Sequence, residues 1–495
     1  MPRSTPPEVA VTAIPVSAAP LPAASAPALK GVLASLSLAM GLSALGTSIA
    51  NVALPSLVQS LSAPFQAVQW VVLAYLLTLT VAIVSLGRLG DLWGRRRLMR
   101  VGLAVFTLGS AACGLSATLW QLVAARVVQG LGAATLMALS MALVSERVPQ
   151  HQAGSAMGLL GSVSAVGTAL GPTLGGVLIG ACGWQAVFWV NVPLGLAALA
   201  MAHRYLPPDV RRPNAQAVRF DPLGTVLLVL GLGAWALAMT LGSGSFGAVN
   251  LGWLLAAVAG LAAFAFAQAR VSAPLVRLAL FRHPVMGTGF ATSALVTTVV
   301  MATLVVGPFY LAGALGLDAT RMGLVMSVGP AVAALFGAPA GRLVDRVGSR
   351  GVALGALLAM GLGAAALPMA ASVWGVVGYA GALGLITAGY ATFQAANHTA
   401  VMGSAAADER GLVSGLLNLS RNLGLITGAS AMGAVFHLGA GTPQGATAHA
   451  LQLAAGLRLT FGVAAALVAM AGVLTILGFC KKKAFIATQK SASSY

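Results

Sequence analysis

The sequence predicts an all-α polytopic membrane protein in which fourteen helices cross the bilayer in a six plus two plus six arrangement, with both termini in the cytoplasm. Three observations support this class: composition, the number of long apolar segments, and the placement of basic residues. Of the 495 residues, 7% are charged and 58% are hydrophobic, whereas about a quarter of an ordinary soluble domain is charged. The 61 glycines suit helices that pack closely in lipid.

Each predicted span is long enough to cross the membrane. The hydrocarbon layer is about 30 Å thick and a helix rises about 1.5 Å per residue, so a span takes about 20 mostly apolar residues. Residues 1–29 are rich in Pro and Ala without a continuous apolar core, and we expect a flexible cytoplasmic tail there rather than a signal peptide. In chain order the expected spans are 31–54, 70–86, 98–115, 122–144, 153–182, 184–201, 223–241, 251–267, 285–311, 322–340, 352–370, 373–393, 412–436 and 459–479.

The basic residues test this count, because Lys and Arg accumulate in cytoplasmic loops. With the N-terminus inside, 23 of the 27 Lys and Arg fall on the inner side. Arg321 and Arg458 fall outside, and Arg126 and Arg421 fall within spans. A miscounted span would invert the bias downstream of the error, so an even count with both termini inside is favoured.

Several function classes are disfavoured by the sequence. The net charge of +18 is spread through an apolar chain with 6% aromatic residues, which argues against a nucleic-acid partner. Cys113, Cys182 and Cys480 lie in apolar stretches without metal-ligand spacing, so we expect neither a disulfide framework nor a metal site. There is no nucleophile elbow, P-loop or pair of carboxylates. We therefore expect no enzyme, no cofactor and no self-contained ATP-driven pump.

A short repeat divides the chain into two halves. Residues 87–96 read GRLGDLWGRR and residues 341–350 read GRLVDRVGSR, identical at six of ten positions across an offset of 254. Repeated halves are typical of secondary transporters, with the substrate site between the halves near the midplane. The expected organisation is a six-helix bundle over 30–206, an inserted, peripheral helix pair with its linker over 207–270, a second six-helix bundle over 271–480, and a cytoplasmic tail over 481–495.

Four motifs carry a family resemblance. GRLGDLWGRRRLM at 87–99 resembles the signature loop of the major facilitator superfamily, and Arg126 followed by VVQGLGAA resembles its fourth-helix motif. GTALGPTLGG at 167–176 is similar to the fifth-helix motif of its drug exporters, and IANVALP at 49–55 to the first-helix signature of its fourteen-helix drug:proton antiporters. The resemblance implies the major facilitator fold and export of small amphipathic compounds or drugs by alternating access, in exchange for protons.

The repeated loops are the candidate gates. A carboxylate at the end of the second span, Asp91, can face the positive N-terminus of a neighbouring helix, and Arg95 can pair with it or with another acid. The alternative is a purely structural turn. The candidate gating residues are Gly87, Asp91, Gly94 and Arg95 in the first half and Gly341, Asp345, Gly348 and Arg350 in the second.

The fifth span carries a face of small residues. Gly167, Gly171 and Gly175 lie four apart, and Pro172 removes one backbone hydrogen bond, giving a smooth contact surface with a local kink. Together with Gly176 these residues are candidates for a conformational role, the alternative being a packing seam.

Polar residues inside spans are the candidate cavity. Arg126 is the strongest candidate, because an arginine in a span costs a few kcal/mol unless it is paired or faces water. We expect it to point into the cavity and to take part in proton or substrate coupling, or else to be a structural hydrogen-bond hub. Arg421 is its counterpart in the second half, unless it snorkels to the inner surface. His398 has a proton role or a structural one. The full candidate set is Asn51, Tyr75, Arg126, Gln129, Asn397, His398, Asn418 and Arg421.

One departure from the family pattern concerns proton coupling. The first-helix signature commonly carries an acid where this chain has Gly46, and none of the nine acidic residues lies deep in a span. A coupling proton would then use Asp91, Glu146 or a network around Arg126. The two span arginines also favour anionic or neutral amphiphiles as substrates.

These observations predict a multi-pass transporter of the bacterial cytoplasmic membrane, working as a monomer on a small-molecule substrate, with protons as the coupling ion. The main alternative is a narrow-specificity metabolite facilitator or exporter of the same fold. A non-transporting receptor on the same scaffold is a further alternative.

Overall fold

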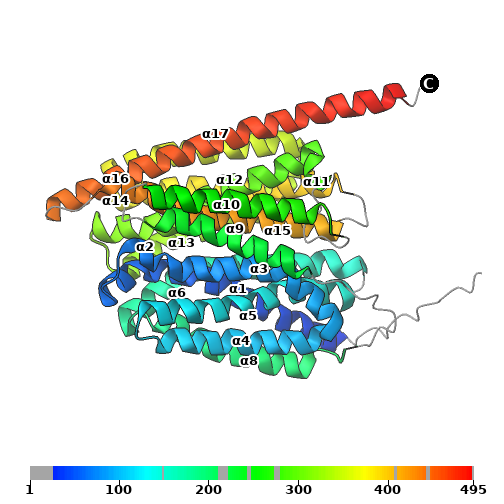
Figure 1. Ribbon diagram of the computed structural model, residues 1–495, viewed down its shortest axis with the longest axis horizontal. Coiled ribbons are helices and arrows are strands. Elements are labelled where there is room, and N and C mark those ends of the chain that lie inside the picture. Colours follow the sequence, from blue (N-terminus) through cyan, green and yellow to red (C-terminus); the bar gives the residue numbers. More distant parts are fainter. Residues whose placement is uncertain are drawn as a thin grey trace, which may run out of the picture.

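A computed structural model describes residues 26–147, 150–209, 221–241, 247–271, 279–405, 410–441 and 446–492, and every regular element in these ranges is helical. The helices run roughly side by side along one direction (Figure 1). In chain order they are α1 (Ala26–Ser60), α2 (Phe65–Val68), α3 (Trp70–Trp93), α4 (Arg95–Leu115), α5 (Leu119–Arg147), α6 (Gln150–Cys182), α7 (Ala186–Trp189), α8 (Asn191–Tyr205), α9 (Pro222–Thr240), α10 (Ala248–Gln268), α11 (Ala279–Arg282), α12 (Pro284–Gly313), α13 (Ala319–Val347), α14 (Ser349–Met402), α15 (Arg410–Thr427), the π-helix η1 (Gly428–Met432), α16 (Gly433–Ala440) and α17 (Ala446–Ala492).

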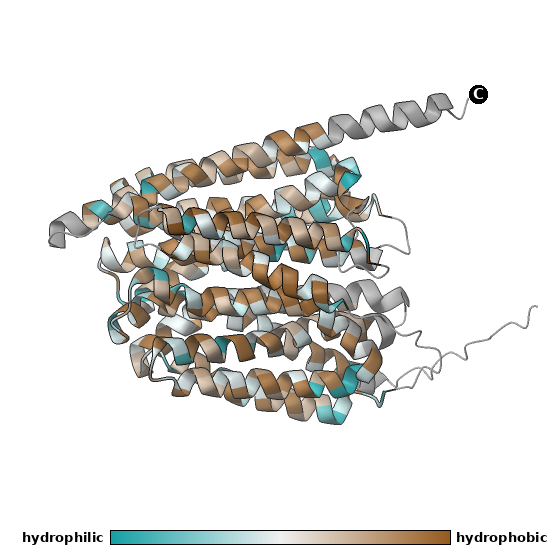
Figure 2. Cartoon of the chain, in the orientation of Figure 1, coloured by the Kyte–Doolittle hydropathy of each residue, from teal (hydrophilic) through white to brown (hydrophobic). Residues whose placement is uncertain are grey.

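Twelve helices in the described ranges are long and apolar enough to cross a membrane. Hydrophobic residues predominate along the lengths of the helices, and many of the hydrophilic ones lie toward their ends (Figure 2). The chain is thus a multi-pass membrane protein. The 54 residues of α14 are far more than one span needs, and Gly375 interrupts them with φ 54° and ψ −127°. In α6, which has 33 residues, the stretch Val166–Cys182 is a shorter apolar segment.

The helices form two groups with a pair between them. In Figure 1 the helices α1, α3 to α6 and α8 lie together in the lower part, and α12 and α14 to α17 in the upper part. The pair α9 and α10 packs closely on itself. Of the two, α10 is the more exposed, whereas α9 contacts both α3 and η1. The Trp70 indole N–H donates to the Thr240 hydroxyl at 3.1 Å, which joins α9 to α3.

The sequence repeat corresponds to a repeated backbone geometry. Gly94 ends α3 with φ 96° and Gly348 ends α13 with φ 88°. Side chains other than glycine rarely adopt this region. Each glycine sits between two helices in a tight reversal, and the two reversals lie at the same end of the bundle. We call this the basic end, because the arginines of both repeated loops lie there, and the other the opposite end.

Candidate functional site

A sealed polar cluster surrounds Arg126 inside the N-terminal group of helices. The side chain is 0% exposed. Its Nε donates to the Val71 carbonyl at 2.8 Å and its Nη1 to the Gly46 carbonyl at 3.1 Å. Nη1 also donates to Gln129 Oε1 at 2.5 Å. Arg126 therefore ties α5 to α1 and α3 through backbone carbonyls.

Aromatic rings complete this enclosure. The guanidinium carbon lies 4.1 Å from the centre of the Tyr75 ring and 5.8 Å from that of Phe188, a geometry that attracts a cation to the negative ring face. Tyr75 is itself buried and donates from its hydroxyl to the Ser43 carbonyl at 2.9 Å. Arg126 Nη2 has no hydrogen-bond partner among the described groups. The geometry is that of a hub between helices.

Asn51 and Gln129 make different contacts. Gln129 belongs to the Arg126 cluster and donates to the Ser110 hydroxyl at 2.8 Å. Asn51 instead donates to the carbonyls of Thr47 and Ser48 on its own helix, at 3.2 and 3.3 Å. Its amide is thus engaged locally rather than with the arginine.

The C-terminal group contains an open polar cavity of about 250 Å³. All of its lining residues come from α12, α14 and α15, and seven of the eight are polar: Ser293, Gln394, Asn397, His398, Ser414, Leu417, Asn418 and Arg421. The four C-terminal candidates from the sequence, Asn397, His398, Asn418 and Arg421, therefore meet in one place.

Arg421 differs from Arg126 in its surroundings. It is half-buried and makes no hydrogen bond or ion pair with any described residue. It lies eleven residues from the start of α15, which is about 16 Å at 1.5 Å per residue. The His398 side chain is exposed and also lines this cavity, so the cavity communicates with the surface.

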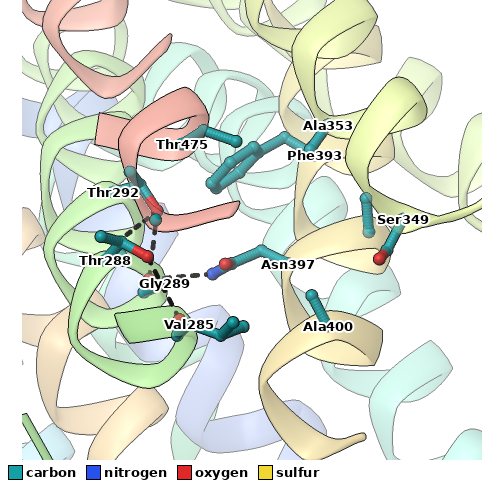
Figure 3. Close-up of a pocket in the computed structure, with 12 residues that line it drawn as sticks. Val285, Thr288, Gly289, Thr292, Ser349, Ala353, Phe393, Asn397, Ala400 and Thr475 are labelled. Carbon is teal, nitrogen blue, oxygen red and sulfur yellow. Dashed lines mark hydrogen bonds between the residues drawn. The ribbon is translucent and has the colours of Figure 1, made fainter. Parts of the chain in front are cut away.

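Asn397 separates this cavity from a smaller one between α12, α14 and α17. Figure 3 shows its amide pointing at Gly289, whose carbonyl accepts from Asn397 Nδ2 at 3.0 Å. The small cavity, of about 20 Å³, has room for about one water molecule. Asn397 thus joins α14 to α12, and the larger cavity remains the candidate site.

The two groups of helices meet closely at the opposite end of the bundle. Gln69 Nε2 donates to the Ala429 carbonyl at 2.9 Å, from α3's N-terminus to η1. The Phe65 ring lies with its centre 4.5 Å from that of Phe309 and 6.1 Å from that of Phe436. Aromatic packing and a buried hydrogen bond therefore close this end.

The glycines of α6 contribute to two different contacts. Gly167, Gly171 and Gly175 face α1, and a Cβ on any of them would meet atoms of that helix. Pro172 lies within α6, buried. Gly176 faces α13 in the C-terminal group, where a Cβ on it would come within 2.9 Å of Gly323 Cα. The predicted small face is thus both an internal seam and a contact between the groups.

The predicted gates at the basic end are described in part. The side chains of Asp91 and Glu146 lie outside the described part of the structure. Arg95 Nη1 donates to the Ala142 carbonyl of α5 at 2.8 Å. In the second loop Asp345 is exposed and Arg350 is half-buried. A Cβ at Gly87 would barely reach Ala138, and one at Gly341 would meet nothing.

An acid that the sequence analysis did not single out caps α4. Asp209 accepts hydrogen bonds from the backbone N–H groups of Arg96, at 2.8 Å, and Arg97, at 3.1 Å. Arg96 Nη2 also donates to the His203 carbonyl at 2.8 Å. The chain that leaves α8 is thereby fastened to the first signature loop.

The sequence profile of the Major Facilitator Superfamily matches residues 36–429 and, in a second alignment, 289–493. The chain belongs to this superfamily. Members of the superfamily are membrane transporters rather than enzymes. The two groups of helices and the repeated loop at the basic end are accordingly those of a superfamily transporter.

Relatives within the superfamily include named exporters. The chain is 33% identical over 415 residues to multidrug resistance protein Stp of Mycobacterium tuberculosis, covering 81% of this chain and 75% of that protein. It is 34% identical over 349 residues to the tetracenomycin C resistance and export protein of Streptomyces glaucescens, covering 70% and 62%. The uncharacterized transporter YebQ of Escherichia coli is 32% identical over 402 residues, covering 81% and 87%.

Solved superfamily transporters share the fold. The inward-facing, unoccupied bacterial homolog of the human lysosomal transporter Spinster superposes with a TM-score of 0.67 at 16% identity, covering 92% of this chain and 98% of that chain. A D-xylose-proton symporter superposes with a TM-score of 0.64 at 14% identity, covering 90% and 97%.

The sequence analysis missed the residues that close the opposite end. Gln69 and Phe65 lie at the edge of a predicted span, where a polar or aromatic residue is ordinary. Gly323 follows the start of a span without the periodic repeat that marked α6. The signal available in the sequence was a glycine about one turn into a span of the second half, where it can pack against α6.

Proposed function

We propose that this superfamily transporter is an exporter of small amphipathic compounds that works by alternating access with protons as the coupling ion, as in the fourteen-helix drug:proton antiporters. The observation that carries the proposal is the combination of an open polar cavity in the C-terminal group with close contact between the groups at the opposite end. A transporter closed on one side and hollow toward the other has the geometry that alternating access requires.

Fourteen spans with both termini in the cytoplasm belong to the same proposal. Three observations support that count: there are twelve candidate spans, α14 divides into two at Gly375, and α6 adds one more. The arginines at the basic end then make that end cytoplasmic by the positive-inside rule, in a bacterial cytoplasmic membrane. The cavity accordingly takes substrate from the inside, with the protein acting as a monomer.

We propose that acids at the basic end couple proton movement to transport. Asp91 and Glu146 are the candidate acids, because none of the acids with described side chains lines the polar cavity. The names of the Mycobacterium and Streptomyces relatives support drug export for this chain.

A narrow-specificity metabolite transporter is the second candidate. The cavity's small volume and its single apolar residue, Leu417, favour it, since binding pockets for drug-sized ligands are mostly apolar and of about 300–1,000 Å³.

Efflux from cells tests the proposal. Loss of a lipophilic dye and of several anionic and cationic antibiotics is measured in cells with the protein and with empty vector, with and without a protonophore. We expect gradient-dependent loss of unrelated compounds. Asp91→Asn is expected to reduce it, whereas Asp318→Asn, the same change at an exposed helix cap, is expected to leave it intact. Export of one compound class, unaffected by the protonophore, would instead favour the metabolite transporter.

A further inference from the structure

We propose that the polar cavity of the C-terminal group binds an organic anion whose acidic group pairs with Arg421. This inference names the substrate class of the site and rests on the proposed transport function. The juxtaposition that carries it is one guanidinium, without a partner among the described residues, surrounded by polar side chains of which none is acidic, in a surface-connected cavity.

The charge of the cavity is one-sided. Among its lining side chains Arg421 is a permanent cation, His398 is neutral or positive, and no lining residue is acidic. A cationic substrate would therefore meet repulsion and no counter-charge. An anion would supply the charge that the cavity lacks.

The acids with described side chains are all engaged or placed elsewhere. Asp221 accepts from Gly224 N and Gln268 Nε2 at the start of α9. Asp209 caps α4, and Asp318 pairs with Arg321 at 3.4 Å. Asp345 is exposed at the end of α13. None of these four lines the cavity.

The depth of Arg421 makes a bound anion favourable. An arginine about 16 Å along α15 lies near the middle of a layer about 30 Å thick, where an unpaired charge is costly. No described residue accepts a hydrogen bond from the Arg421 guanidinium, which lines the cavity. Its planar fork matches the two oxygens of a carboxylate, or two of the three oxygens of a sulfonate, better than a point charge does.

The surroundings of Arg126 differ from those of Arg421, and only Arg421 is placed to bind an anion. In the N-terminal group the carbonyls of Val71 and Gly46 and the Tyr75 ring already surround the guanidinium of Arg126, which is fully buried. An anion has no path to it in this arrangement. Of these two arginines, Arg421 is the one that a substrate can reach.

Binding to the purified full-length protein in detergent tests the inference. The probes are naphthalene sulfonate and naphthylmethyl trimethylammonium, which share a ring system and keep opposite charges at every pH. We expect the sulfonate to bind and the ammonium to bind far more weakly. Arg421→Gln should weaken sulfonate binding about ten- to a hundredfold, because a charge-assisted pair is lost.

Two further variants separate charge, geometry and folding. Arg421→Lys keeps the charge but loses the fork, and should fall between wild type and Arg421→Gln. Arg321→Gln removes an arginine that is exposed at the opposite end, and should bind the sulfonate as wild type does. Thermal unfolding of each variant shows whether it is folded. If Arg421→Gln fails to fold, the lysine variant alone decides the role of the planar fork.

The outcomes separate this inference from the proposed function. Sulfonate binding that Arg421→Gln or a folded Arg421→Lys leaves unchanged, or tighter binding of the ammonium to wild type, would overturn the inference. Export of cations with no dependence on Arg421 would overturn it and leave the exporter standing. Binding of the sulfonate through Arg421 without transport of either probe in proteoliposomes would retain the anion site and refute export.

Discussion

The contact between Gly176 of α6 and Gly323 of α13 should control which end of the transporter is open. Each is the close neighbour of the other: a Cβ on either would lie 2.9 Å from the Cα of the facing glycine. The Thr320 hydroxyl also donates to the Gly176 carbonyl at 3.4 Å. Alanine at either position should therefore push the two helices apart at the opposite end.

The size of the effect follows from the overlap. Ordinary carbon contacts are about 3.5–4.0 Å, so the helices must separate by about 0.5–1 Å. Inserting a methyl group into a well-packed contact typically costs about 1–3 kcal/mol. Because the cost falls on the state closed at this end, the population closed there should drop relative to the open state by about 5- to 150-fold.

Distance measurement between spin labels reports this shift. Cys182 is exposed at the end of α6 in one group, and Leu438 is exposed on α16 in the other. Labels at Cys182 and Leu438→Cys, with Cys113 and Cys480 replaced by serine, should give a short distance in the parent. Gly176→Ala and Gly323→Ala should add a longer one.

The control for this experiment is another glycine of α13. Gly337 has nothing within 4 Å of an added Cβ, so Gly337→Ala should leave the distance distribution unchanged. If the alanine variants at Gly176 and Gly323 give the same distribution as the Gly337 variant, the close glycine contact does not hold this end closed, and the reasoning fails.

Three further predictions concern residues that fasten helices together. Arg126→Leu removes the buried hydrogen bonds from Arg126 to the Val71 and Gly46 carbonyls and to Gln129, so we expect the free energy of unfolding to fall by about 2–4 kcal/mol. An unchanged melting temperature in detergent would contradict the role of Arg126 as a hub. Asp209→Ala should speed hydrogen exchange of the Arg96 and Arg97 amides about five- to tenfold, in line with the usual value of a helix cap, while Asp209→Asn should have less effect. Asp221→Ala should loosen the α9–α10 pair; cysteine cross-linking between these helices should fall, and equal cross-linking would show that the cap is dispensable.

The helices were predictable because each is fixed by local composition. A run of apolar residues of membrane length forms a helix whatever its neighbours are, since backbone groups in lipid must be paired within the segment. The same locality explains Gly94 and Gly348, which a repeated ten-residue motif marked in the sequence and which adopt the same backbone conformation. The interruption at Gly375 falls just inside the predicted span 373–393, three residues beyond the predicted break at 371–372.

The partners across the fold were not predictable in the same way. Two of the three groups that accept hydrogen bonds from Arg126 are the backbone carbonyls of Gly46 and Val71, and a carbonyl leaves no trace in residue identity. Gln69 likewise bonds a carbonyl 360 positions away. Asp209 belongs to the predicted linker that begins at residue 207, but only the fold brings it to the start of α4.

Arg126 and Arg421 illustrate the limit most clearly, and they also define how the two halves divide their work. In the sequence both are arginines within a span, with an amide side chain three residues away. Packing separates them, because aromatic rings and carbonyls enclose the first while the helices around the second leave a cavity. A half whose buried cation is enclosed by its own helices can move as a rigid body, and a half whose cation faces a cavity can respond to a ligand. If the bound anion neutralises Arg421, substrate binding changes the electrostatic cost of burying that arginine. A ligand can shift a conformational equilibrium only when it interacts differently with the two states, and this change in cost supplies such a difference.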